Sequence, residues 1–213
     1  MALILPRSVM IHIPKTGGTW CAEAIKNAGV KYEEPRLPNT TLVQSRHCSI
    51  NAVADRVGSR LTFGFIRHPL SWIRSNWRYI CDRGVYKKWK DSSTHWTSRC
   101  WSLDFITFVK NVIAKSPGAP SQAMFSRLGF VANPEKHIWE KGPNVVKFIG
   151  RTEYLSGDLC EAMARANEQF DLRALGMTPK ARVSKAKVNR EATAKLRKQI
   201  EKSNPQLMDM LNL

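Results

Sequence analysis

The chain has 213 residues, 43% hydrophobic and 24% charged, a balance typical of a globular protein that argues against a largely disordered chain. This length suits one domain that is large enough to bury a two-sided sheet. The net charge of +17 favours an anionic partner, which includes nucleotides, acidic acceptors, nucleic acid and anionic membrane surfaces.

The cysteines and the apolar segments indicate in which cellular compartment the protein is expected. Five cysteines are scattered without a C-x-x-C pair, so we expect neither a disulfide framework nor a zinc site, and a reducing compartment is favoured. The apolar start at 2–5 is interrupted by Pro6 and Arg7, and no later stretch approaches about 18 consecutive apolar residues. No membrane span is predicted. We expect a cytoplasmic protein of a bacterial or viral type, unless an N-terminal anchor has been lost.

The first element is a predicted buried strand at 9–13, followed by a glycine loop and a helix that ends near 27–29. Such a unit directs unpaired N–H groups and the positive end of a helix dipole at one point, which predicts a phosphate site. Lys15 adds a positive charge, and the hydroxyls of Thr16 and Thr19 add donors. The loop is not a Walker A sequence, because Lys15 precedes both glycines.

Two further strand and helix units are predicted next. A short strand at 41–44 precedes a helix at 50–57, which Ser49 would cap and Gly58 would end. Between them lies His47, which on local sequence is a solvated residue near a helix start.

A strand at 61–66 is the clearest in the chain, and Pro69 is suited to open the helix after it. Arg67 ends this strand, and Ser75 lies two turns into the helix. We expect both to face the crevice above the sheet, the usual ligand position in open α/β folds.

Residues 83–101 lack a consistent period and combine basic residues with Tyr86, Trp89, Trp96 and Trp101. Two interpretations stay open for this insertion. Either it is an acceptor-binding flap, in which tryptophan faces stack on sugars or bases, or its tryptophans anchor a long loop to the core.

The last third of the chain continues the alternation of helices and strands. Its predicted elements are a helix at 103–113 capped by Ser102, a short helix at 121–128, a strand at 144–149, a helix from Ser156 to about Phe170, and a helix at 190–202 capped by Asn189. The C-terminal segment at about 180–213 is basic. Between Lys180 and Lys202 nine basic residues accompany two acidic ones. Two interpretations stay open: the helix at 190–202 presents an ordinary solvated face, or the loop before it closes over phosphate.

Four segments together resemble one family. Residues 14–19 resemble the 5′-phosphosulfate loop of sulfotransferases that use PAPS (3′-phosphoadenosine 5′-phosphosulfate), and residues 63–75 resemble their 3′-phosphate motif. Residues 148–155 are similar to the family's Phe-x-Gly-Arg-x-Glu-x-Leu stretch, and residues 45–49 resemble the segment whose histidine is taken as the catalytic base. The likeness is to bacterial, viral and Golgi carbohydrate-type sulfotransferases.

The resemblance implies a fold and an activity. It implies a P-loop-like α/β fold, a three-layer sandwich with a central, mainly parallel sheet flanked by helices, in a single domain over 1–213. It implies in-line transfer of a sulfuryl group from PAPS, with PAP as the product and no metal required, to a hydroxyl or amine of an acceptor. We expect that acceptor to be a carbohydrate or glycolipid, with an acidic glycan suited to the charge, and no nucleic-acid partner; the oligomeric state is open.

The resemblance also assigns residues. His47 would accept the acceptor's proton, and Lys15 would stabilise the charge on the departing phosphate. The residues expected to bind the nucleotide, at two anion sites a nucleotide's length apart, are Pro14, Lys15, Thr16, Gly17, Gly18, Thr19, Trp20, Arg67, Ser75, Arg151, Arg182 and Lys185. His95 is a reserve base, and His12 is expected to be a satisfied core histidine.

Two rival functions remain open. A nucleoside or small-molecule kinase with an atypical phosphate loop would bind ATP with magnesium and ignore a 3′-phosphate. A nucleic-acid-binding protein that used residues 83–101 and the basic C-terminus would bind DNA or RNA with a steep salt dependence.

Overall fold

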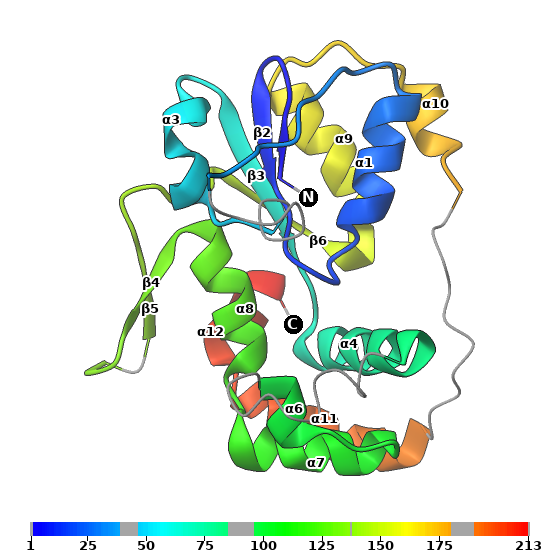
Figure 1. The fold of residues 1–213 in the computed structure, drawn as a ribbon, viewed down its shortest axis with the longest axis vertical. Helices are drawn as coiled ribbons and strands as arrows, with labels where there is room; N and C mark the ends of the chain where they lie inside the picture. Colours follow the sequence, from blue (N-terminus) through cyan, green and yellow to red (C-terminus); the bar gives the residue numbers. More distant parts are fainter. Residues whose placement is uncertain (1, 39–46, 85–95, 137, 180–189, 213) are drawn as a thin grey trace. The chain divides into compact units, whose positions relative to one another are not determined.

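The computed structural model describes residues 2–38, 47–84, 96–136, 138–179 and 190–212 (Figure 1). The chain divides into two compact units. Unit 1 comprises Met1–Arg67 and Met124–Arg182, and unit 2 comprises His68–Ala123 and Val183–Leu213. The prediction of a single sulfotransferase domain stays a prediction.

Unit 1 is built on a four-stranded sheet whose order is β1 (Leu3–Ile4), β2 (Ser8–Ile11), β3 (Leu61–Ile66), β6 (Phe148–Arg151). β2, β3 and β6 are parallel, and β1 is an antiparallel edge strand on β2. The predicted mainly parallel sheet is therefore confirmed. The sequence did not predict β1, because a strand of two residues is too short to show a period of two.

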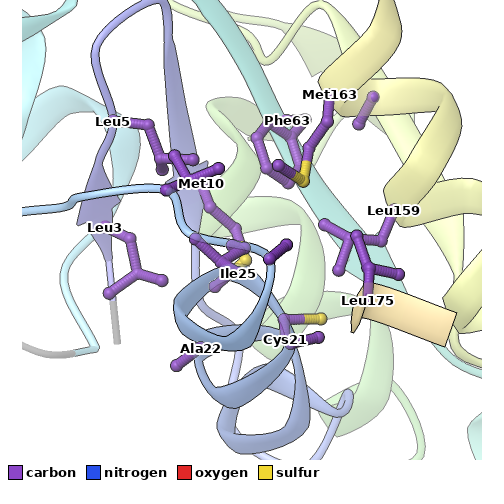
Figure 2. Close-up of a cluster of buried hydrophobic side chains, with 14 of the residues drawn as sticks. Leu3, Leu5, Met10, Cys21, Ala22, Ile25, Phe63, Leu159, Met163 and Leu175 are labelled. Atoms are coloured by element: carbon purple, nitrogen blue, oxygen red, sulfur yellow. The ribbon is translucent and has the colours of Figure 1, made fainter. Parts of the chain in front are cut away.

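One face of the sheet is covered by α1 (Gly18–Asn27), α9 (Leu155–Arg165) and the short α10 (Leu172–Gly176). Figure 2 shows Ile25 of α1 and Leu159 and Met163 of α9 gathered around Phe63 of β3. All four side chains are fully buried. Burial of a side chain of this size is worth roughly 1.5–3 kcal/mol, so this cluster holds both helices on the sheet.

The opposite face is covered by the end of α8 (Ala119–Leu128). A Cβ on Gly64 of β3 would lie 2.6 Å from Cδ2 of Leu128, so glycine permits the close approach. The sheet of unit 1 is thus flanked by helices on both faces. The remaining elements of unit 1 are η1 (Ile50–Val53), α3 (Ala54–Val57), the hairpin β4 (Phe130–Asn133) and β5 (Ile138–Lys141), and η2 (Thr152–Tyr154).

Unit 2 is helical. It contains α4 (Pro69–Arg83), α6 (Trp96–Cys100), α7 (Phe105–Lys115), α11 (Arg190–Lys202), α12 (Pro205–Leu211) and the start of α8. Phe108 of α7 lies 6.1 Å from the ring centres of both Trp96 and Trp101, and Trp96 stacks on Trp72 of α4 at 5.4 Å. Trp96 and Trp101 therefore anchor the end of the 83–101 insertion to the core of unit 2. Tyr86 and Trp89 lie outside the described residues.

Two buried polar side chains hold the helices of unit 2 together. His68 caps α4, because its Nδ1 accepts a hydrogen bond from the N–H of Leu70 at 3.2 Å. Its Nε2 therefore carries the proton and donates to Oε1 of Glu201 in α11 at 2.9 Å. Asn204 before α12 accepts two hydrogen bonds from Ser121 and donates two to main-chain carbonyls.

Several predicted boundaries differ from the structure. α7 begins at Phe105 and is capped by Asp104, not Ser102, since the Asp104 carboxylate accepts from the N–H of Thr107 at 2.7 Å. α9 begins before Ser156 and ends at Arg165, well short of the predicted Phe170. The late strand is 148–151 instead of 144–149. The predicted strand at 41–44 and the cap at Asn189 lie outside the described residues.

Candidate functional site

The loop between β2 and α1 has the backbone of an anion-binding turn. Lys15 has φ 69° and Gly17 has φ 87°, and such left-handed residues within a turn direct successive N–H groups inward. For lysine this conformation is uncommon, and strain of this kind is concentrated at functional sites. Helix α1 has no acidic residue in its first turn and no side-chain cap on its first N–H groups. The end of the loop thus presents positive charge and unpaired N–H groups.

The side chains of the loop are used differently from one another. The hydroxyl of Thr16 is buried and donates to the carbonyl of Ile13 at 2.9 Å, so it braces the turn, contrary to its predicted use as a donor to phosphate. The Thr19 side chain is exposed, as a ligand-binding hydroxyl requires. Trp20 is half-buried against the core, and its indole N–H donates to the carbonyl of Thr178 at 3.3 Å.

Arg67 bonds directly to this loop. It follows β3, the strand next to β2, and its Nη1 donates to the carbonyl of Lys15 at 3.0 Å. Arg67, expected at the 3′-phosphate, is therefore in direct contact with the loop expected at the 5′ end, and the expected spacing of the two sites stays a prediction. Lys15 and Arg67 face the same end of the sheet, because parallel strands bring their carboxyl ends to one edge.

Thr152, which lies in the 148–155 segment but is not among the predicted site residues, also joins the loop to the sheet. Its hydroxyl lies 2.9 Å from the carbonyl of Ile66 at the end of β3 and 3.2 Å from the carbonyl of Thr16. Since a hydroxyl has one proton, it is shared between the two carbonyls. Thr152 follows β6 directly, so three adjacent strand ends meet through hydrogen bonds at the loop.

Arg151 ends β6 at the same edge. Its guanidinium lies 4.5 Å from the ring centre of Tyr154, and its Nε lies 3.8 Å from a carboxylate oxygen of Asp158. The main-chain N–H of Arg151 also donates to Asp158 at 2.6 Å. These contacts fix the Arg151 guanidinium at the end of β6, and its predicted role in binding the nucleotide stays a prediction.

His47 lies in unit 1 and is half-buried. Nε of Arg127 donates to the main-chain carbonyl of His47 at 3.2 Å. Partial burial lowers the pKa of Arg127 from its ordinary value, and burial raises the pKa of the neighbouring thiol of Cys48. Arg127 is thus a desolvated arginine that holds the backbone of the predicted base in place.

His12 is not the satisfied core histidine that the sequence predicts. It is buried, but its Nδ1 has no hydrogen-bond partner in the part of the chain that the structure describes. Its ring centre lies 4.8 Å from that of His47, with the planes tilted by 49°. Two histidines therefore meet beside the loop between β2 and α1.

The remaining predicted residues lie in unit 2 or outside the described residues. Ser75 lies in α4 of unit 2, so its pairing with Arg67 stays a prediction. Arg182, Lys185 and His95 lie outside the described residues. Within the described ranges no cluster of three or more histidine, cysteine or carboxylate side chains is arranged to hold a metal ion. Over the same ranges no helix combines the length and apolarity needed to cross a bilayer.

No protein-family model, curated protein or solved structure matches this chain.

Three residues of the site were missed or misjudged from sequence for a common reason. Thr152, Arg127 and His12 act through contacts between segments that are far apart in the chain, and local pattern carries no such information. The one available signal was position, because Thr152 and His12 each directly follow a strand of the parallel sheet.

Proposed function

We propose that this chain is a sulfotransferase that moves a sulfuryl group from PAPS to a hydroxyl or amine of an acceptor. One observation carries the proposal. The ends of three adjacent parallel strands bring the phosphate loop, Arg67 and Arg151 to one edge, and hydrogen bonds join Arg67 and Thr152 to the loop. PAPS carries phosphate at both ends of its nucleotide, so it requires separate anion-binding groups that share one edge of the sheet.

Each residue then has a role in in-line transfer. The N–H groups at the start of α1 and the charge of Lys15 stabilise the negative charge that develops on the departing phosphate. Arg67 and Arg151 hold the nucleotide's other anionic groups. His47, whose reference pKa is about 6.5, accepts the acceptor's proton near neutral pH.

The test compares four nucleotides by isothermal titration calorimetry: PAP, PAPS, AMP, and ATP with and without magnesium. We expect PAP and PAPS to bind most tightly and without magnesium, and labelled sulfate to pass from PAPS to an acceptor in a panel of glycans, glycolipids and phenols. Binding of ATP that depends on magnesium, with indifference to a 3′-phosphate, would instead indicate a kinase.

Two variants separate the roles. His47→Ala should abolish transfer while PAP still binds, and a loss of PAP binding would move His47 from proton transfer to nucleotide contact. Arg67→Ala should weaken PAP more than AMP if Arg67 holds the 3′-phosphate. Equal losses would mean that Arg67 acts by bracing the loop through the Lys15 carbonyl.

A further inference from the structure

His12 is a buried histidine that the proposed transfer does not use. It follows β2 directly, and its side chain is only 7% exposed. Nδ1 of the ring has no hydrogen-bond partner within the described residues. Buried polar groups are almost always hydrogen-bonded, so this exception calls for a physical explanation.

The ring of His12 lies against the first turn of α1. A Cβ placed on Gly18 would lie 1.9 Å from Cδ2 and 2.3 Å from Nε2 of His12, far inside van der Waals contact. Gly18 does not have a positive φ, whereas Gly17 does. The glycine at 17 is therefore required by backbone conformation, and the glycine at 18 by the imidazole of His12.

The other neighbour of this ring is His47. The two ring centres are 4.8 Å apart, and the His47 backbone is held by Arg127. His47 is thus constrained at its main chain by one residue and at its imidazole by another. A pair of contacts of this kind sets the direction of a side chain as well as its place.

We propose that His12 is a positioning residue, whose imidazole holds the ring of His47 beside the first turn of α1. The ring contact stands on the geometry alone, while its consequence for turnover rests on the proposed function. His47 would then receive the acceptor's proton next to the loop that binds the leaving phosphate. His12 itself need not touch either substrate.

The first experiment uses the folded wild-type protein and needs no substrate. Imidazole carbon–proton NMR spectra resolve the histidine rings, and His47→Gln and His12→Leu assign the two resonances. We expect a nuclear Overhauser effect between the rings of His12 and His47. In His12→Leu the His47 resonance should shift, whereas in the control Met10→Leu, a substitution in the strand that precedes His12, it should stay in place. Absence of the Overhauser effect in the wild-type protein would overturn the proposal.

The second experiment measures function. His12→Leu should lower turnover roughly 10- to 100-fold, the scale of a misplaced catalytic group, while the Kd for PAP changes less than about threefold. Gly18→Ala should weaken PAP binding, and the double variant His12→Ala/Gly18→Ala should restore it by making room for the methyl group. A double variant no better than Gly18→Ala, or a PAP affinity that falls in parallel with turnover, would refute the positioning role. If the wild-type protein transfers no sulfate, the proposed function fails, and the NMR result still decides the ring contact.

Discussion

Thr152→Val tests whether stability and PAP binding depend on the hydroxyl that joins the loop between β2 and α1 to the sheet. Valine keeps the shape of threonine and removes its hydroxyl, which lies within hydrogen-bond distance of the carbonyls of Ile66 and Thr16. A hydrogen bond contributes about 0.5–1.5 kcal/mol, and leaving a buried carbonyl unsatisfied adds to this loss. Because the side chain is only half-buried, water compensates in part, and we expect a loss of about 1–1.5 kcal/mol in the free energy of unfolding.

This loss is measurable in two ways. For a chain of this size it corresponds to a fall in Tm of roughly 2–6 °C, followed by circular dichroism. If the displaced loop binds phosphate, the Kd for PAP should rise about tenfold, the equivalent of about 1.4 kcal/mol, in calorimetric titrations.

Thr152→Ser is the matched control, since it keeps the hydroxyl and loses only the methyl group. It should bind PAP like the wild-type protein. The reasoning is refuted if the valine variant keeps both stability and PAP affinity, or if the serine variant is equally impaired. Loss of stability with unchanged PAP affinity would leave the hydroxyl as a structural link alone.

The remaining predictions concern unit 2. Asn204→Ala should lower the free energy of unfolding by about 3–5 kcal/mol, because a buried network of four hydrogen bonds loses its centre, and urea denaturation measures this loss. His68→Ala should cost about 1–3 kcal/mol through loss of the α4 cap and of the bond to Glu201, and His68→Asn should recover about 1 kcal/mol by restoring the cap to Leu70, as thermal unfolding will show. Partial burial acts to raise the pKa of Glu201, but hydrogen bonds from Arg197 and His68 hold it below its ordinary value of 4.5. Its contribution to stability is thus full above about pH 4.5 and lost as the pH falls through the lowered pKa, and Glu201→Gln should flatten this part of the acid-unfolding profile.

Local chemistry determined several elements of both units from sequence. The strand at 61–66, the helix opening at Pro69 and the glycine loop before α1 all follow from short-range preferences of β-branched, proline and glycine residues, and the structure confirms them. The cap of α7 was placed wrongly, because Ser102 and Asp104 are both good caps and only the fold decides which one begins the helix.

The amino-acid sequence by itself determined that a strand, a glycine turn containing Lys15 and a helix would follow one another, because these preferences act over a few residues. Only the tertiary structure decided what surrounds that turn. Arg67, Thr152 and His12 meet there because three parallel strands end at one edge, and the pairing of distant strands cannot be read from any single stretch of the chain. The loop of the site therefore follows from local sequence, whereas the contacts that surround it follow from the tertiary structure.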